Sequence, residues 1–137
     1  MKLTKHFTLE ELCASSTAKR LNISNKPTNE EIDNMKHLAL SILEPLRLFM
    51  QKPIYINSGF RSQKLNKAVG GVASSQHTRG EAADIRVTTI AEGKVMFEYI
   101  RRNTPFDQLI WERNARGSRW IHVSARRDGR NRHQVIC

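Results

Sequence analysis

Cysteine is nearly absent from this sequence, in which Cys13 and Cys137 are the only two. They lie far apart in the chain, and neither has a closely spaced partner. Small disulfide scaffolds and cysteine-type zinc ribbons need several closely spaced cysteines, so both classes are excluded. Synthesis in a reducing compartment is the simplest expectation.

Long apolar runs are also missing. No stretch of about 18 consecutive apolar residues occurs, so the sequence predicts no membrane span. The opening MKLTKHFTLEEL lacks the apolar run of a signal peptide, which predicts synthesis in the cytoplasm without an export signal. With 137 residues, of which 39% are hydrophobic and 26% charged, the chain is expected to form one domain, residues 1–137, with one core.

Acidic residues are few. The 13 Asp and Glu residues stand against 23 Lys and Arg, which gives a net charge of +10. Such a charge attracts polyanions, among them nucleic acid, anionic lipid and anionic cell wall. A basic nucleic-acid-binding protein is one alternative, but it rests on charge alone, because no reading helix, zinc finger or aromatic RNA-binding motif is present. A solvated basic surface explains the charge equally well.

Helix starts are predicted by the spacing Thr-x-x-Glu of a capping box, which occurs at Thr8, Thr28 and Thr89. The helix that begins at Thr89 is expected to end near Thr104. After Thr28, apolar residues recur at spacings of three and four, which predicts an amphipathic helix that Pro45 kinks or interrupts. The apolar positions of this helix are Ile32, Met35, Leu38, Ile42, Leu46 and Phe49.

Strands are predicted by four short segments rich in β-formers, residues 53–58, 82–87, 106–112 and 120–125. Between the first two, residues 59–81 are expected to form a loop of a length that compact domains usually reserve for function. Helices come early and strands mostly late, with irregular links between the strands. This order favours an α+β fold with a mostly antiparallel sheet and helices packed around it.

Potential metal ligands stand in or beside these strands. His77 lies near the end of the long loop, Asp84 lies among apolar neighbours in a predicted strand, and His122 lies in the last one. Two imidazoles and one carboxylate are a ligand set of catalytic zinc sites. A buried carboxylate also needs a cation or strong hydrogen bonds. Taken singly, each histidine is more often a surface or hydrogen-bonded residue, so spacing alone leaves the metal site open. No role is predicted for the other histidines, His6, His37 and His133.

A family resemblance adds to these observations. The stretch NSGFRSQKLNKAVGGVASSQHTRGEAADI, with FDQLIWE and WIHVS, resembles the zinc D-Ala-D-Ala carboxypeptidases of the M15 peptidase family. The likeness extends to the opening HFTLEELCASSTA and so covers nearly the whole chain. Its most specific element is the pattern SxHxxGxAxD, which begins at Ser75 and ends at Asp84. The resemblance implies a hedgehog/DD-peptidase-like fold.

The resemblance also implies roles for single residues. It implies that the three candidate ligands hold one zinc ion, in agreement with their ligand chemistry. It implies that Arg61, in GFRS, binds the terminal carboxylate of a peptide substrate, because the guanidinium fork matches a carboxylate. An ordinary loop arginine on a basic protein is the alternative. Ser75 and Gln76 are expected to contact substrate or to orient His77, although a polar loop would contain both for no reason.

The general base is the least determined residue. Many relatives place a Glu or His a few residues before the last zinc histidine, whereas no such residue directly precedes His122. Glu112 matches the position of a glutamate in hedgehog domains and is predicted to accept the proton of the attacking water. A surface ion pair with Arg113 or Arg116 is its alternative role. Asp107 is the reserve candidate.

These features predict a zinc metallopeptidase that hydrolyses the stem peptides of peptidoglycan. A D-Ala-D-Ala carboxypeptidase is the leading interpretation, with endopeptidase cleavage within the stem left open. A phage or prophage endolysin, made in the cytoplasm and released by lysis, would reach the cell wall without an export signal. A non-catalytic zinc-containing wall-binding module is the alternative. The chain is expected to act as a monomer without a nucleic-acid partner.

Overall fold

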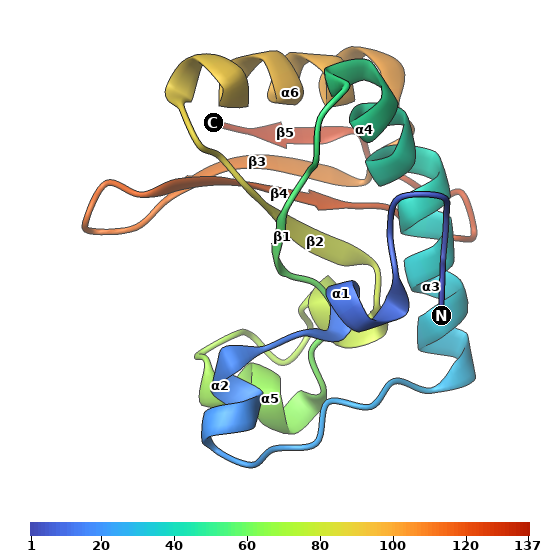
Figure 1. The fold of residues 1–137 in the computed structure, drawn as a ribbon, viewed down its shortest axis with the longest axis vertical. Coiled ribbons are helices and arrows are strands. Elements are labelled where there is room, and N and C mark those ends of the chain that lie inside the picture. Colours follow the sequence, from blue (N-terminus) through green and yellow to red (C-terminus); the bar gives the residue numbers. More distant parts are fainter.

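The computed structural model describes residues 1–137 as an α+β fold with one mixed sheet (Figure 1). The sheet has the order β1-β2-β4-β3-β5. Its strands are β1 (Ile56–Ser58), β2 (Ala82–Arg86), β3 (Gln108–Arg113), β4 (Arg119–Ser124) and β5 (Gln134–Ile136). The α-helices are α1 (Leu9–Cys13), α2 (Ser16–Arg20), α3 (Asn29–Leu38), α4 (Glu44–Met50), α5 (Gln63–Ala68) and α6 (Ile90–Asn103). No helix is both long and apolar enough to cross a membrane.

The sheet is mostly antiparallel, as expected, and β5 is the exception. Strands β1, β2, β4 and β3 pair antiparallel in that order, whereas β5 pairs parallel with β3. Strand β5 carries no signal in the sequence, because its three residues are exposed and too few to show a period. The likeness to hedgehog domains stays a prediction.

The two faces of the sheet differ because side chains alternate along each strand. Ala83, Ile85, Leu109, Ile121 and Val123 are fully buried and belong to the hydrophobic core. Helix α6 packs on this face of β3 and β4, where Gly93 makes room for Trp111: a Cβ at Gly93 would lie 2.7 Å from the Trp111 ring. The alternate residues of β2, β4 and β3 therefore face the other way and remain available for a site.

The helix ends confirm two of the three capping boxes in full. At Thr8 and at Thr28, the threonine side chain accepts from the third backbone N–H, and the glutamate there accepts from the threonine N–H. At Thr89 the hydroxyl accepts from the backbone of Glu92. The Glu92 carboxylate instead pairs with Lys52, so the third box is only half formed.

Pro45 has the predicted effect on the long helix. A π-helical segment, Ala39–Leu43, separates α3 from α4 just before this proline. Proline lacks an N–H and its ring crowds the carbonyl four residues earlier, so the regular α-helical bonding cannot pass through it. The prediction that Phe49 faces the core is wrong: it is 52% exposed and stacks on Tyr99 of α6, with ring centroids 4.4 Å apart.

The predicted loop of residues 59–81 is partly helical. It contains α5 and a 3₁₀-helix, Gln76–Arg79. Both helices are too short for hydrophobic periodicity to reveal them. Each begins at a serine whose hydroxyl accepts from a backbone N–H, Ser62 for α5 and Ser75 for the 3₁₀-helix. The segment is therefore folded and is not an open loop.

A buried ion pair fixes the C-terminal segment to the sheet. Asp107 is fully buried, and its carboxylate accepts from the backbone N–H of Arg132 at 2.8 Å and from its guanidinium at 3.0 and 2.9 Å. Burial alone would raise the pKa of Asp107, but these hydrogen bonds and the charges of Arg132 and Arg126 lower it to about 2. The aspartate thus holds the chain that leads into β5.

Loss of this pair is expected to destabilise the fold. The native pKa of Asp107 lies below its unfolded value, so its contribution of about 2 kcal/mol is present above pH ~4 and is lost as the pH falls toward 2. Asp107→Asn should lower the free energy of unfolding at pH 7 by about 2–3 kcal/mol, and its stability should fall less steeply than that of the wild type between pH 5 and 2. Urea unfolding at several pH values measures both effects. The exposed Asp33→Asn is the matched control; equal stability of the two variants would contradict the prediction.

Candidate metal centre

Two of the predicted ligands meet because of the strand register. Asp84 of β2 and His122 of β4 are direct cross-strand partners, on the face of the sheet opposite α6. Directly opposed residues have their Cβ atoms about 5 Å apart, within reach for a shared ligand. A slip of one residue would place either side chain in the core, so the apolar residues on both sides of Asp84 and His122 also determine the site.

The third ligand comes from the 3₁₀-helix. The Ser75 hydroxyl accepts from the backbone N–H of His77 at 3.2 Å. Gly80 ends the helix with φ 74°, a left-handed conformation, and a Cβ there would lie 2.6 Å from the carbonyl oxygen of Glu31. This tight turn connects the helix directly to β2, so His77 lies beside Asp84 although seven residues separate them in sequence.

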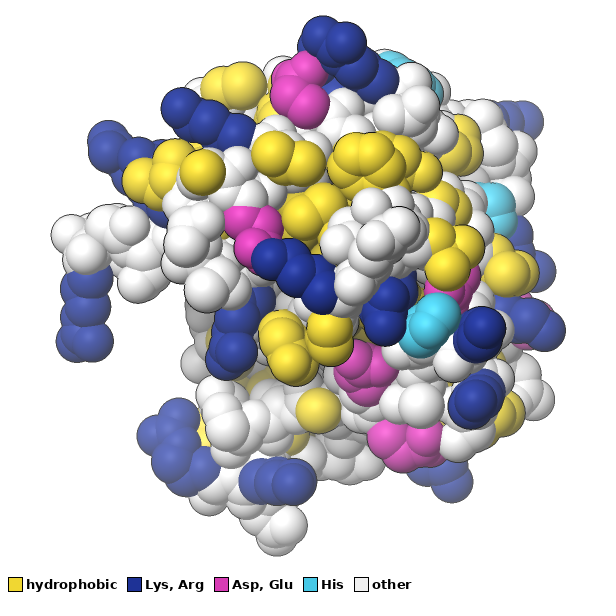
Figure 2. Space-filling view, turned by 45° about the horizontal axis from the view of Figure 1, so that its top comes forward, with side chains coloured by type: hydrophobic (Ala, Val, Ile, Leu, Met, Phe, Trp, Pro, Cys, Tyr) yellow, Lys and Arg dark blue, Asp and Glu magenta, His cyan; other side chains and the backbone are white.

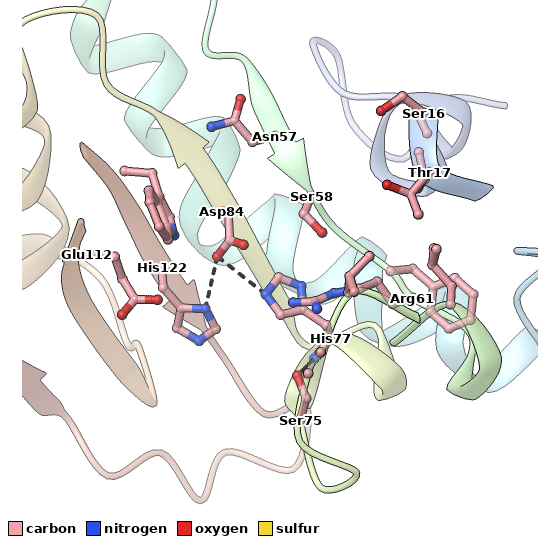
Figure 3. Close-up of a pocket in the computed structure, with 18 residues that line it drawn as sticks. Ser16, Thr17, Asn57, Ser58, Arg61, Ser75, His77, Asp84, Glu112 and His122 are labelled. Atoms are coloured by element: carbon pink, nitrogen blue, oxygen red, sulfur yellow. Dashed lines mark hydrogen bonds and ion pairs between the residues drawn. The ribbon is translucent and has the colours of Figure 1, made fainter. Parts of the chain in front are cut away.

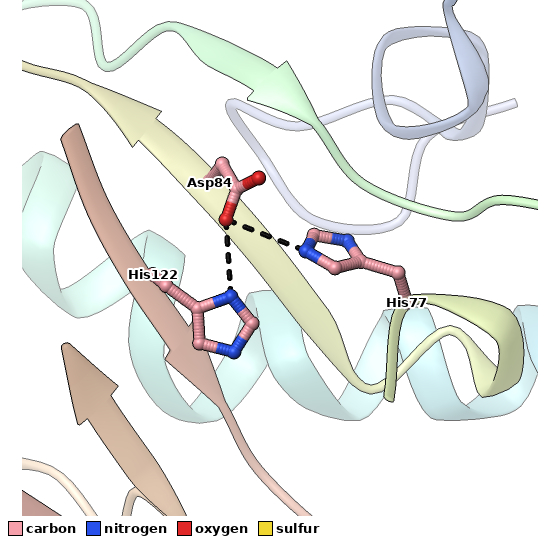
Figure 4. A group of neighbouring side chains, drawn as sticks. All are labelled: His77, Asp84 and His122. Carbon is pink, nitrogen blue, oxygen red and sulfur yellow. Dashed lines mark hydrogen bonds and ion pairs between the residues drawn. The ribbon is translucent and has the colours of Figure 1, made fainter. Parts of the chain in front are cut away.

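The three side chains form one group (Figure 4). The Oδ1 atom of Asp84 lies 3.0 Å from Nδ1 of His122 and 3.3 Å from Nε2 of His77. One potential ligand atom from each residue lies within 4.8 Å of the others. Burial alone would raise the pKa of Asp84, but hydrogen bonds from the two histidines and their charges hold it well below its usual range. The carboxylate is therefore ionised and able to bind a cation.

The tautomer of His77 suits a metal ligand. Its ring is almost completely buried, at 2% exposure, and its Nδ1–H donates to the carbonyl oxygen of Gly59 at 2.7 Å. A carbonyl oxygen can only accept, so Nδ1 keeps its proton, and Nε2, which faces Asp84, is the nitrogen that gives up its proton to bind a cation. The donor set of two imidazoles and one carboxylate fits zinc, with a position left open for water or substrate.

The metal group lies in a cleft of about 610 Å³. One wall is the sheet, with Asp84, Glu112, Trp120 and His122, and the other is formed by α2, α5 and the loop between β1 and α5. Figure 3 shows Ser16 and Thr17 of α2 across the cleft from the metal group. Sequence reasoning missed this polar wall, and Asn57 and Ser58 beside it, because hydroxyl and amide residues carry no periodic signal.

Arg61 lines the same cleft. Its backbone N–H donates to the carbonyl oxygen of His77 at 3.0 Å, which ties the two residues together. Burial lowers the pKa of its guanidinium, partly offset by the charge of Asp84, yet an arginine remains charged in a protein. Its Nε is buried without a hydrogen-bond partner. A charged donor without a partner inside a cleft indicates a site for an anionic group.

Glu112 also lines the cleft. It pairs with Trp120 across β3 and β4 and forms no ion pair with Arg113 or Arg116, which was its alternative role. Figure 3 shows its carboxylate next to His122. The reserve candidate, Asp107, is wrong, because it is buried against Arg132 and does not line the cleft.

Ser75 and Gln76, the two predicted contacts in the loop, lie in different positions relative to the cleft. Ser75 lines the cleft, but its hydroxyl already accepts from the backbone of His77, which favours the orienting role. Gln76 does not line the cleft; its side chain is directed to Glu81, with a nitrogen–oxygen distance of 3.4 Å. A substrate contact from Gln76 is therefore not supported. Neighbours in a 3₁₀-helix point in directions about a third of a turn apart, so they rarely share a cleft.

Comparisons with known proteins agree with this site. A family described as peptidase M15 matches residues 5–124, most of the chain. A segment of 59 residues is 37% identical to a zinc D-Ala-D-Ala carboxypeptidase of Streptomyces albus G. This segment is 43% of the present chain and 22% of that relative, so the similarity spans about a fifth of the relative's length.

Proposed function

Since the chain belongs to the peptidase M15 family, we propose that it is a zinc peptidase that hydrolyses peptidoglycan stem peptides, and specifically a D-Ala-D-Ala carboxypeptidase. The observation that carries the proposal is the His77–Asp84–His122 group in a cleft that also contains Glu112 and Arg61. The named relative supports the substrate class. Residues 1–137 act as a single domain that holds one zinc ion.

Each cleft residue has a separate task in this reaction. When bound, zinc polarises a peptide carbonyl and acidifies water. Glu112 accepts a proton from the attacking water at its carboxylate and returns it to the leaving amine. Arg61 binds the terminal carboxylate with its free guanidinium N–H groups and so places the last peptide bond beside the metal group. Gly59 keeps His77 in the required tautomer through its carbonyl oxygen.

Two alternatives receive less support from the site. A non-catalytic zinc module does not need Glu112 beside the metal group or a partnerless arginine in the cleft. Nucleic-acid binding usually uses a continuous basic surface, whereas Figure 2 shows Lys and Arg side chains scattered over the visible face. The same positive charge suits an anionic cell wall. An endolysin role, with release by lysis, belongs with the endopeptidase activity, because removal of a terminal D-alanine cuts no link of the wall; it predicts that added protein clears suspensions of purified walls.

Release of D-alanine tests the proposal. The purified protein, loaded with one equivalent of zinc, should release D-alanine from a stem pentapeptide that ends in D-Ala-D-Ala. Removal of the metal with a chelator should abolish release, and zinc should restore it. A folded, zinc-loaded protein that releases no D-alanine but binds purified walls would instead support the non-catalytic module. Larger fragments without free D-alanine would support an endopeptidase.

Arg61 provides a prediction of its own. Arg61→Gln should raise KM for the pentapeptide by about 10–100-fold, because a hydrogen bond to a charged group is worth about 1.5–3 kcal/mol. The same pentapeptide with a C-terminal amide is the matched control: the wild type should cleave it poorly, and the variant should cleave both peptides equally slowly. A wild type that cleaves the amide as well as the acid would contradict carboxylate binding at Arg61.

A further inference from the structure

A second row of side chains lies beside the metal group on the same face of the sheet. Arg86 pairs with Trp120 across β2 and β4, and Trp120 pairs with Glu112 across β4 and β3. Tyr55 extends this row toward β1, since its carbonyl oxygen accepts from the Arg86 N–H. Arg86 lies two residues along β2 from Asp84, and Trp120 lies two residues along β4 from His122. The second row is therefore about 6.6 Å from the row that contains these two metal ligands.

The second row lies on the side of the metal group away from Arg61. Strand β1 is antiparallel to β2, so the chain after Ser58 continues toward the Ala82 end of β2, whereas Arg86 is at the other end. Figure 3 likewise shows Arg61 and Glu112 on opposite sides of the metal group. A peptide with its C-terminus at Arg61 and its last bond at the metal group therefore extends its preceding residues over the second row.

Arg86 has no acidic partner. It takes part in no ion pair, in contrast to Arg79, Arg101 and Arg132, which each bind a carboxylate. The acidic residue that shares a surface hollow with it, Glu92, is paired with Lys52. Its guanidinium lies over the Tyr55 ring, 5.3 Å from the centroid. This stacking does not neutralise the charge, and the hollow that Arg86 lines lies outside the cleft of the metal group, beyond Trp120 in the row.

Glu112 does not neutralise Arg86 either. Trp120 lies between them in the row, so their backbones are two strand spacings apart, about 9.5 Å. The indole of Trp120 lines the cleft on this side. The row thus presents a base, an aromatic surface and an arginine in sequence, and the arginine is free for an anion.

We propose that Arg86 binds a carboxylate on the side chain of the second residue before the cleaved bond, a role that rests on the proposed function. The spacing between the rows equals about two residues of an extended peptide. In stem peptides ending in D-Ala-D-Ala this position holds either diaminopimelate or lysine, which differ by one carboxylate. Arg86 selects the diaminopimelate peptide, since a guanidinium attracts a carboxylate and repels a side chain that carries only an amine.

Three peptides of the form X-D-Ala-D-Ala test this specificity, with X as diaminopimelate, its side-chain amide or lysine. The wild type should cleave the diaminopimelate peptide with kcat/KM about ten-fold above the other two, mostly through KM. Arg86→Gln should bring the diaminopimelate peptide down to the level of the amide and leave the amide peptide unchanged. Arg86→Lys should restore part of the preference, because it keeps the charge without the fork.

The control variant is Arg116→Gln, at the tip of the β3–β4 hairpin, which should leave all three rates unchanged. Equal cleavage of the carboxylate and amide peptides by the wild type would overturn the role of Arg86 and leave the peptidase assignment intact. Absence of cleavage of all three by the zinc-loaded protein would overturn the proposed function itself, and the Arg86 proposal with it. Thermal unfolding of each variant excludes loss of folding as the cause.

Discussion

Glu112→Gln is expected to lower kcat by about 10²–10⁴-fold while the protein keeps its zinc, because general acid–base catalysis contributes a factor of that size. Glutamine has the shape of glutamate but cannot accept a proton at neutral pH, so binding of substrate and metal should persist. Glu112 is well placed for this effect, since it shares the cleft with His122 and has no ion-pair partner that would occupy its carboxylate. KM should change little.

The measurement is D-alanine release at saturating peptide, together with zinc content by atomic absorption. Glu30→Gln, an exposed glutamate in the first turn of α3, is the matched control and should have wild-type kcat. If Glu112→Gln keeps both zinc and full activity, the general base lies elsewhere. If it loses zinc, Glu112 is instead required for metal binding.

His122→Ala is expected to weaken zinc binding by more than about 100-fold, since loss of a second-shell partner alone costs about 10–100-fold. The substitution removes one of three ligands and also leaves the ionised Asp84 without a partner that lies 3.0 Å from it. Activity should fall with the zinc content. Strand β4 should remain paired, because the core residues Ile121 and Val123 are unchanged.

Zinc affinity by competition with a chromophoric chelator measures this effect without any substrate. His133→Ala is the matched control, because His133 is exposed and lies outside the cleft. Circular dichroism compares folding of the two variants. Wild-type zinc affinity in His122→Ala would exclude His122 as a ligand and leave the family assignment without its metal site.

Local sequence signals predicted much of the fold. Threonine and glutamate at capping spacing located the starts of α1, α3 and α6, and short β-rich segments located β2, β3 and β4 within one or two residues. The short elements α2, α5 and β5 could not be predicted, because three to six residues show no resolvable period. The C-terminal segment is held by Asp107 and Arg132, a pair 25 residues apart that no local pattern shows.

The candidate site was also predictable only in part. Ligand chemistry marked His77, Asp84 and His122 as candidates, because an imidazole or a carboxylate is identifiable as a possible ligand wherever it occurs. The resemblance to the M15 carboxypeptidases then selected these three from the other histidines and carboxylates. The same reasoning could not separate Glu112 from Asp107, or Ser75 from Gln76. Both pairs contain chemically similar candidates, and the direction of each side chain depends on the surrounding structure.

Residue type alone establishes which side chains are able to bind a metal, accept a proton or hold a carboxylate. Which of them share a cleft depends on how the strands pair. The antiparallel register of β2, β4 and β3 places Asp84 beside His122 and aligns Arg86, Trp120 and Glu112 in a second row. Register depends on backbone pairing between segments far apart in the chain, such as Asp84 with His122, which are 38 residues apart. A shift of one residue would turn each of these side chains to the other face, which is why no local sequence signal predicts the row.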